Sequence, residues 1–293
     1  MKVLILGGTG MLGHKLYQML GEPFDAWVTV RQDASSLARY SFYCPDRVIG
    51  GVDANHEESI RGAIETVRPD AVVNCIGLIK QHPLAKNPEA CISINALLPH
   101  RLASICGEFG ARFVHISTDC VFAGTKGGYK ESDLTDAEDL YGRTKALGET
   151  AAPNAVTLRT SIIGRELEGG YGLVEWFLAQ GDMETSAYSN AFFSGFPTHE
   201  LTRVIGSVLL DHPALTGIYQ VSSDPIDKAS LLGLLRESYD TKTPLRPLSE
   251  PRIDRTLDSS RFRNATGYRP PPWPEMIREM ASDATPYVLW RKK

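Results

Sequence analysis

The sequence predicts an α/β fold, a doubly wound parallel sheet with a smaller C-terminal lobe. Short apolar runs rich in β-branched residues alternate with segments of helical apolar spacing through the first half of the chain, as in a parallel sheet covered on both faces. A glycine-rich turn directly follows the first of these runs. Beyond about residue 160 the alternation weakens, and glycines and aromatic residues cluster instead. These observations predict a sheet domain at residues 1–160 and a substrate-binding lobe mainly at residues 161–293.

The expected elements alternate in the order that a parallel sheet requires. Each strand is a short apolar run, and each helix carries apolar residues at helical spacing. The expected strands are residues 2–6, 27–30, 47–49, 71–75, 112–117 and 155–159, and the expected helices are residues 12–20, 57–67, 91–106 and 141–150. An amphipathic helix at 201–210 and a strand at 217–221 indicate that residues 199–222 thread back into the sheet domain.

The first strand leads directly into a turn of the sequence Gly-Gly-Thr-Gly-Met-Leu-Gly, which opens the first helix. The glycines permit a tight turn and let backbone N–H groups and the helix N-terminus approach a pyrophosphate. Such turns also occur where a helix merely packs closely on a strand, but the position of this one favours a Rossmann-type dinucleotide site. The expected cofactor-binding residues of the turn are Gly7, Thr9, Gly10, Met11, Leu12 and Gly13.

Arg31 follows the second strand, at the position that selects between NAD and NADP. An acidic residue there would bind the ribose 2′-hydroxyl of NAD, whereas a guanidinium favours the 2′-phosphate of NADP. Asp33 lies close by, and an exposed arginine with no ligand is the alternative. NADPH is therefore the preferred cofactor, and NAD stays open.

The third and fourth strands end in further candidate cofactor residues. Asp53, after the third strand, is expected to accept a hydrogen bond from the adenine amino group. The backbone near the pyrophosphate and ribose is expected to come from Asn74, Cys75, Ile76 and Gly77.

Asn95 is a polar residue among apolar ones inside the expected helix 91–106. It is expected to stabilise the end of the fourth strand by hydrogen bonding. For both Asp53 and Asn95, a capping or surface role is equally consistent with the sequence.

Ser117-Thr118-Asp119 ends the fifth strand, and Tyr141-Gly-Arg-Thr-Lys145 opens a helix further on. Hydride addition to a ketone needs a proton donor for the oxygen. A phenol has a pKa of about 10, and this pKa must be shifted toward the working range for the phenol to act as that donor. Lys145, four residues after Tyr141, shares its helix face and is expected to stabilise the phenolate. Thr118 or Ser117 is expected to donate a hydrogen bond to the developing oxyanion.

The alternative is a surface tyrosine and lysine that share a helix face without function. Of the 11 tyrosines, however, only Tyr141 has a lysine four residues later. The pattern thus predicts a carbonyl reductase with Thr118, Tyr141 and Lys145 as catalytic residues.

Composition excludes several classes of protein. The 293 residues are 42% hydrophobic and 23% charged with a net charge of −4, which is ordinary for a globular protein and gives no electrostatic case for a nucleic-acid partner. We expect neither a signal peptide nor a membrane span. The five cysteines are widely spaced without a zinc pattern, so we expect reduced thiols in a cytoplasmic protein and no metal site. A homodimer stays open, because no hydrophobic stripe marks an interface.

The order of these motifs resembles the extended short-chain dehydrogenase/reductase superfamily and, within it, the dTDP-4-dehydrorhamnose reductase family. The matching stretches are residues 7–13, 72–74, 117–124, 129–133, 141–149, 158–161, 195–198 and 255–262. The resemblance implies NADPH-dependent reduction of the C4 ketone of a nucleotide-linked 4-keto-6-deoxy sugar. It implies that Tyr141 is the general acid and that Lys145 is its partner and binds the cofactor ribose. It also implies that Thr118 contacts the substrate carbonyl.

The resemblance also supplies candidate substrate-binding residues. Arg255 would lie near the sugar nucleotide, where a guanidinium suits a diphosphate. The full candidate set is Ser117, Asp119, Cys120, Ile162, Trp176, Pro197 and Arg255. For Cys120, a buried hydrophobic role is the stronger alternative.

One departure bears on the substrate. The family usually carries a tryptophan where this chain has Ile162, and that position borders the sugar. Residues 74–80 and 172–177 are more similar to relatives that act on UDP-linked N-acetylated 4-keto-6-deoxyhexoses in capsule or O-antigen pathways. A UDP-linked N-acetylated sugar is therefore a second hypothesis for the substrate.

Other functions on the same fold remain as alternatives. The β subunit of methionine adenosyltransferase also resembles this family and is a non-catalytic regulatory subunit, a role that a decayed catalytic motif would favour. A nucleotide-sugar epimerase would retain a tightly bound NAD. A dehydratase needs an added acid and base near the Ser-Thr position, and Asp119 followed by Cys120, with no glutamate, argues against it.

Overall fold

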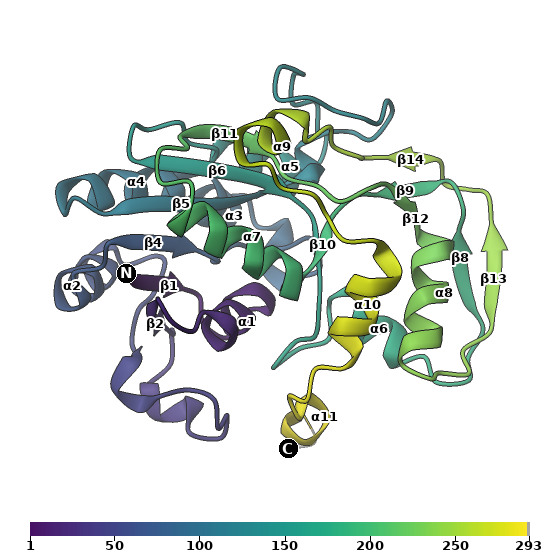
Figure 1. Ribbon diagram of the computed structural model, residues 1–293, viewed down its shortest axis with the longest axis horizontal. Coiled ribbons are helices and arrows are strands. Elements are labelled where there is room, and N and C mark those ends of the chain that lie inside the picture. Colours follow the sequence, from purple (N-terminus) through teal and green to yellow (C-terminus); the bar gives the residue numbers. More distant parts are fainter. Residues whose placement is uncertain (292–293) are drawn as a thin grey trace.

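A central sheet of seven parallel strands organises the computed structural model, which describes residues 1–291. The strand order is β11-β6-β5-β4-β1-β2-β3. These strands are β1 (Lys2–Leu6), β2 (Asp25–Thr29), β3 (Val48–Ile49), β4 (Ala71–Asn74), β5 (Arg112–Thr118), β6 (Ala155–Thr160) and β11 (Gly217–Gln220). The predicted doubly wound α/β fold is confirmed (Figure 1).

Helices cover both faces of this sheet because alternate strand residues point to opposite sides. Val3 and Ile5 of β1 share one core with α1 (Met11–Met19) and α7 (Thr198–Leu210). Leu4 and Leu6 share a second core with helices α2 (Glu57–Val67) and α4 (Leu98–Glu108). The continuous apolar strands of the sequence follow from this burial on both sides.

The strand order reverses between β1 and β4, which are neighbours in the sheet. In an open α/β sheet, ligands bind outside the carboxyl ends of the strands at such a reversal. Both strands end at the same edge, with Leu6 beside Asn74. The glycine turn after β1 and the segment after β4 therefore lie together at this edge.

The helix predicted at residues 91–106 is longer and irregular. It begins as α3 (Pro88–Cys91), where Asn87 caps the helix by accepting a hydrogen bond from the N–H of Ala90. A π-helical segment, η4 (Ile92–Leu97), follows and continues into α4. Apolar spacing does not separate a π turn from an α turn, so the sequence did not reveal this irregularity.

Small differences occur at other element ends. Helix α5 (Leu140–Leu147) is shorter than the predicted 141–150, and the residue that follows it, Gly148, packs against η4. A Cβ at Gly148 would lie 2.0 Å from the carbonyl oxygen of Asn95. Arg47 lies in the short 3₁₀ turn η2 (Pro45–Arg47) and not in β3. The other expected strands and helices are found within three residues of their predicted ends.

The remaining elements build a smaller lobe beside the sheet (Figure 1). Its strands pair as β10 with β7, β13 with β8, and β12 and β14 on either side of β9. The strands are β7 (Ile162–Ile163), β8 (Thr185–Tyr188), β9 (Ala191–Phe193), β10 (Phe196–Pro197), β12 (Ile226–Asp227), β13 (Leu245–Leu248) and β14 (Ile253–Asp254). The helices are α6 (Leu173–Leu178), α8 (Lys228–Ser238), α10 (Trp273–Ala281) and α11 (Tyr287–Arg291), whereas α9 (Ser260–Thr266) packs on β11 of the central sheet (Figure 1).

The C-terminal segment packs back onto α1. The buried ammonium of Lys15 pairs with Asp283 at 2.5 Å, and the Tyr287 hydroxyl lies 3.0 Å from Nε2 of His14. Trp290 meets the ring of Tyr40 edge-on, with centroids 4.9 Å apart. These contacts tie the small lobe to the helix that follows the glycine turn and to the segment after β2.

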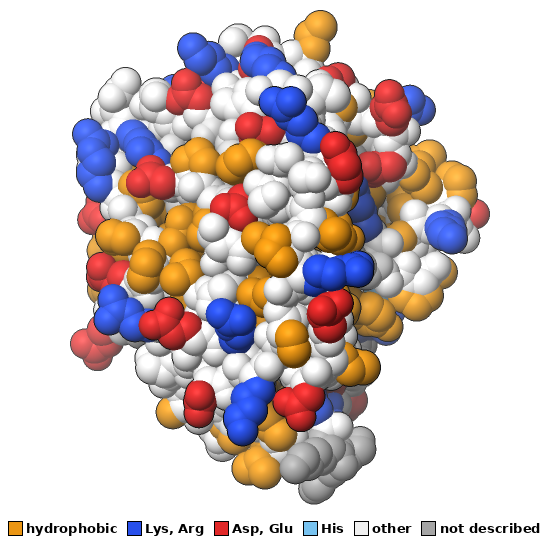
Figure 2. Space-filling view, turned by 90° about the vertical axis from the view of Figure 1, so that its right-hand side faces the viewer, with side chains coloured by type: hydrophobic (Ala, Val, Ile, Leu, Met, Phe, Trp, Pro, Cys, Tyr) orange, Lys and Arg blue, Asp and Glu red, His pale blue; other side chains and the backbone are white. Residues whose placement is uncertain are grey.

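The outer surface carries charges of both signs. Figure 2 shows the face on the side of the small lobe, where cationic, anionic and hydrophobic side chains are interspersed. Within residues 1–291, no helix has the length and apolar character needed to cross a membrane.

Candidate active site

Tyr141 lies in the first turn of α5, and a glycine next to it brings that turn against the end of β5. A Cβ at Gly142 would lie 2.2 Å from the carbonyl oxygen of Cys120, so any larger residue would force the helix away. Asp139 caps the helix, because its Oδ1 accepts the N–H of Gly142 at 2.8 Å. The Tyr-Gly pair of the motif therefore places the phenol beside the residues that follow β5.

Thr118, the last residue of β5, meets the phenol there. Its hydroxyl donates to Asp119 Oδ1 and accepts the N–H of Cys120, both at 3.1 Å, and it lies close enough to Tyr141 to influence the pKa of the phenol. Ser117 faces elsewhere, since its hydroxyl donates to Glu149 at 2.7 Å. Of the two hydroxyls that the sequence offered, the structure thus brings Thr118 to the tyrosine.

The surroundings of Tyr141 favour its protonated form. Burial raises the pKa of the phenol well above its ordinary value, and the nearby Cys120 thiol and the carboxylates of Asp119 and Asp139 raise it further. The nearby Thr118 hydroxyl lowers that pKa in part. The phenol therefore holds its proton at neutral pH, as a general acid must before the reaction.

Lys145 lies one turn further along α5, and its side chain is 5% exposed. Its ammonium donates to the carbonyl oxygen of Ile116 at 2.8 Å and lies 4.0 Å from where a Cβ of Gly77 would stand. Burial lowers its pKa to about 8, and the Glu149 carboxylate opposes that shift. Lys145 thus lies at the end of β4, next to the expected cofactor segment, and its action on the phenol stays a prediction.

The lowered pKa of Lys145 predicts how stability depends on pH. Its charged form is penalised in the folded protein, so this cost is fully present below pH 8 and disappears as the pH rises to 10.5, the ordinary lysine value. The free energy of unfolding of the wild type should therefore rise relative to Lys145→Met across that window, by at most about 3 kcal/mol. Urea denaturation of both proteins between pH 7 and pH 11 measures it.

A matched control replaces a lysine that is more than half exposed. The Lys126 side chain is 55% exposed, so Lys126→Met should follow the wild-type curve through the same pH window. A constant difference between wild type and Lys145→Met would contradict the lowered pKa.

The glycine turn has the geometry that a dinucleotide phosphate requires. Gly7 has a φ of 86°, a conformation that favours glycine, and a Cβ at Gly13 would lie 2.2 Å from the Gly7 carbonyl oxygen. Gly10 is the N-cap of α1 and has no side chain to occupy the first amides of the helix. Backbone N–H groups at the start of α1, from Met11 and Leu12 onward, therefore suit a phosphate.

The end of β4 closes against this turn. Ile76 contacts Gly7, since a Cβ there would lie 3.0 Å from Ile76 Cγ1. Asn74 accepts the N–H of Ile76 at 3.0 Å through its Oδ1. Asn95 exchanges two hydrogen bonds with the backbone of Leu78, at 2.9 and 3.0 Å. Asn74 and Asn95 therefore fix the backbone next to the turn, and their contact with a cofactor stays a prediction.

Arg31 and Asp33 have different surroundings after β2. Arg31 is exposed, whereas Asp33 caps the 3₁₀ turn η1 (Ala34–Leu37) and accepts the N–H of Ser35 at 2.9 Å. Asp53 likewise accepts the N–H of Asn55 at 2.8 Å in a turn before α2. The Asp33 carboxylate, which left NAD open as the cofactor, is thus hydrogen-bonded within its own turn.

The candidate substrate residues fall into two groups. Asp119 and Cys120 are beside Tyr141, and burial raises the pKa of the Cys120 thiol to about 11. Arg255 reaches the same loop from the small lobe and donates to the carbonyl oxygens of Phe122 and Ala123 at 2.8 and 2.9 Å. Arg255 therefore holds the lobe against the site, and its contact with a diphosphate stays a prediction.

The second group lies in the small lobe. Ile162 in β7 pairs with β10, where Pro197 is buried, and Trp176 in α6 is 41% exposed. Helix α6 begins close to the glycine turn, because a Cβ at Gly172 would lie 2.5 Å from Met11 Cε. The substrate role of these residues stays a prediction.

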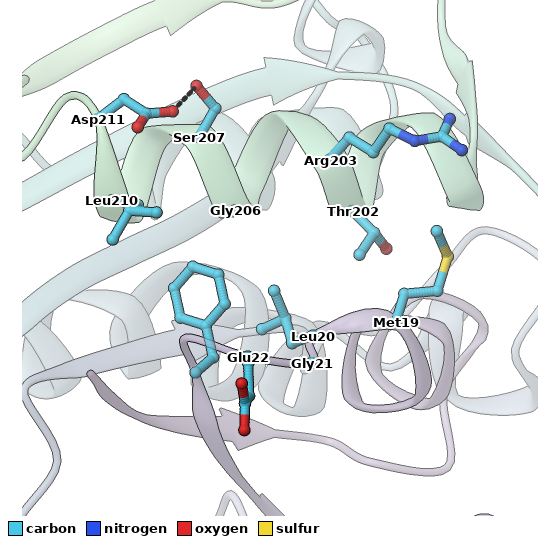
Figure 3. Close-up of a pocket in the computed structure, with 11 residues that line it drawn as sticks. Met19, Leu20, Gly21, Glu22, Thr202, Arg203, Gly206, Ser207, Leu210 and Asp211 are labelled. Atoms are coloured by element: carbon cyan, nitrogen blue, oxygen red, sulfur yellow. Dashed lines mark hydrogen bonds between the residues drawn. The ribbon is translucent and has the colours of Figure 1, made fainter.

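Two hollows on the surface lie away from these residues. One of about 320 Å³ lies between the C-terminal end of α1 and α7, with Leu20, Gly206 and Leu210 in its lining (Figure 3). Another of about 560 Å³ adjoins it at residues 20–25 and Arg47. No predicted site residue lines either hollow, so the candidate site rests on the contacts above. In residues 1–291, no cluster of three or more His, Cys, Asp or Glu side chains is arranged to hold a metal ion.

Two features of the site were missed in the sequence. Lys80 lies over the ring of Tyr141, 5.6 Å from its centroid. The carboxylate of Glu149 forms a buried pair with Arg159. Lys80 follows β4 by six residues in an irregular segment, where no periodicity indicates the direction of a side chain.

Comparison with known proteins agrees with this geometry. The family described as RmlD substrate binding domain matches residues 1–285. The spore coat polysaccharide biosynthesis protein SpsK of Bacillus subtilis is 28% identical over 301 residues, covering 95% of this chain and 96% of that protein. Methionine adenosyltransferase 2 subunit beta of Xenopus laevis is 24% identical over 270 residues, covering 87% of this chain and 77% of that protein.

A solved structure shares the fold. The dTDP-4-dehydrorhamnose reductase of Bacillus anthracis, crystallised in complex with NADP, superposes with a TM-score of 0.80 at 22% identity, covering 95% of this chain and 98% of that one. The resemblance predicted from the motifs is confirmed by the match along nearly the whole chain. This chain therefore belongs to the RmlD substrate binding domain family.

Proposed function

We propose that this protein is an NADPH-dependent reductase of the C4 ketone of a nucleotide-linked 4-keto-6-deoxy sugar, in the biosynthesis of a cell-surface polysaccharide. The observation that carries the proposal is that the first turn of α5, which holds Tyr141, packs against the residues after β5, beside Thr118. Lys145 lies one turn away, and the phosphate-type glycine turn lies at the same sheet edge. Relatives named for a dTDP-sugar reductase and for polysaccharide biosynthesis support the choice of substrate.

The side chains present account for the proton in such a reaction. NADPH, when bound, supplies the hydride that adds to C4. The Tyr141 phenol gives its proton to the ketone oxygen as the C4 alcohol forms, which leaves a phenolate that solvent reprotonates. Thr118 turns its hydroxyl from Asp119 and donates a hydrogen bond to the same oxygen, where negative charge develops. Lys145 provides an ammonium near the phenolate, which lowers the cost of that charge.

The expected cofactor preference is tested at Arg31. Arg31→Ala should raise the KM for NADPH about tenfold, the loss of one hydrogen-bonded charge pair, and should leave the KM for NADH nearly unchanged. Initial rates with each cofactor measure this split. Arg47→Ala is a matched control, since Arg47 is also exposed but pairs with Asp25. Equal effects of Arg31→Ala on both cofactors would remove Arg31 from recognition of the 2′-phosphate.

The nucleotide and the sugar are tested with a panel of substrates. The purified protein is incubated with NADPH and either dTDP-linked 4-keto-6-deoxy sugars or UDP-linked N-acetylated ones, and NADPH oxidation is followed. Turnover of either class supports the reductase. Turnover confined to the dTDP sugar would refute the UDP-linked hypothesis that residues 74–80 and 172–177 suggest.

The same assay separates the alternatives. NADP binding without turnover of any sugar would favour a regulatory subunit, the role suggested by the relative named methionine adenosyltransferase 2 subunit beta. Copurified NAD would favour an epimerase.

The proposal also includes a cytoplasmic location, in keeping with five free cysteines. A homodimer remains an expectation to be measured by sedimentation.

A further inference from the structure

Lys80 lies beside Tyr141 although 61 positions separate them in the chain. It belongs to the irregular segment between β4 and the 3₁₀ turn η3 (Pro83–Lys86). Its ammonium lies 5.6 Å from the centroid of the phenol ring and pairs with Oδ2 of Asp139 at 2.8 Å. The other oxygen of Asp139 accepts the N–H of Gly142. One cation thus connects the segment after β4 with the first turn of α5 and with the phenol ring.

Most of the other groups near Tyr141 raise the pKa of its phenol, and a cation beside the ring opposes that effect. Two anions and a thiol raise the pKa of the phenol, together with burial. The ammonium of Lys145 is hydrogen-bonded to the carbonyl of Ile116. The other charged and titratable groups that act on the phenol or its neighbours are Asp119 and Cys120 after β5, Asp139 of α5, Lys80 after β4, and Arg255 from the small lobe.

We propose that Lys80 is a positioning residue for Tyr141: through Asp139 it fixes the first turn of α5, and its charge over the ring stabilises the phenolate that remains after proton transfer. A cation near an aromatic ring is attracted to its face, and it is attracted more strongly when the ring carries a negative charge. The purpose of this arrangement rests on the proposed reductase function, whereas the effect of the charge on the phenol exists without any substrate.

Two substitutions distinguish this electrostatic role from a purely structural one. Lys80→Met removes a cation and exposes the phenol to the charge of Asp139, so the phenol should titrate about one pH unit higher, the size expected for a partly screened charge at this distance. Asp139→Asn removes an anion and keeps a side chain that caps helices, so the phenol should titrate lower. A purely structural role predicts that both substitutions shift the titration of the phenol in the same direction, because both break the same ion pair.

The titration is followed without turnover. A fluorinated tyrosine, 2,3,5-trifluorotyrosine, is incorporated at position 141 because its phenol is much more acidic than that of tyrosine, and its ¹⁹F resonance is recorded against pH. Lys80→Arg should restore the wild-type midpoint, since it keeps the charge. Lys126→Met is the matched control, because Lys126 also pairs with a carboxylate, Asp133, and lies 5.5 Å from the centroid of another ring, Tyr129.

Opposite shifts for Lys80→Met and Asp139→Asn, with no shift for Lys126→Met, would support the proposal. Shifts of the same sign, or an unchanged midpoint in Lys80→Met, would overturn it. Because no sugar nucleotide is present, these outcomes do not depend on the reductase assay. A protein that fails to reduce any sugar but shows the opposite shifts would refute the proposed function alone.

Discussion

Tyr141→Phe is expected to lower kcat by a factor on the order of 10² or more, which is the loss expected for a positioned general acid. Phenylalanine keeps the ring beneath Lys80 and removes only the phenol hydroxyl near Thr118. The fold and the glycine turn are untouched, so NADPH binding should stay nearly intact. Steady-state kinetics and NADPH fluorescence, measured on the same preparation, give the two quantities separately.

The control removes the same hydroxyl from another tyrosine. Tyr188 lies in β8 of the small lobe, so Tyr188→Phe should retain wild-type kcat. A Tyr141→Phe protein with full turnover would exclude Tyr141 as the proton donor. Loss of NADPH binding together with turnover would indicate a structural role instead.

The sequence predicted the sheet domain well because its signals are local. A glycine turn directly after an apolar strand has few structural alternatives, and the spacing of Tyr141 and Lys145 sets a common helix face. The small lobe was predicted only as a region. Its strands are two to four residues long and pair with partners far along the chain, such as β13 with β8, so no short segment contains the signal.

The roles of individual polar residues depended on contacts that the sequence does not encode locally. Ser117 and Thr118 are neighbours with similar chemistry, and only the pairing of Ser117 with Glu149 shows which one faces the tyrosine. The guanidinium of Arg255 donates to backbone carbonyls of the loop after β5, which no motif indicates. Lys80 reaches Asp139 across 59 positions from a segment without periodicity.

Glu149→Ala is expected to destabilise the protein by about 3–5 kcal/mol, the usual cost of removing one partner of a buried ion pair. The side chains of Glu149 and Arg159 are 4% and 5% exposed, and Arg159 donates to both carboxylate oxygens at 2.7 and 2.6 Å. Without Glu149, the Arg159 guanidinium and the Ser117 hydroxyl lose their partner in a place that water does not reach. Urea denaturation at pH 7 measures the loss.

The destabilisation should come from the unpaired charge and not from the cavity alone. Glu149→Leu combined with Arg159→Met replaces the pair by apolar side chains of similar size, and it should recover most of the lost stability because neither charge is then buried. Glu108→Ala breaks a pair of the same kind with Arg61 on the surface and should change the free energy of unfolding very little. If Glu149→Ala were as mild as Glu108→Ala, the strand that ends in Thr118 would not depend on this pair for its position against β6 and α5.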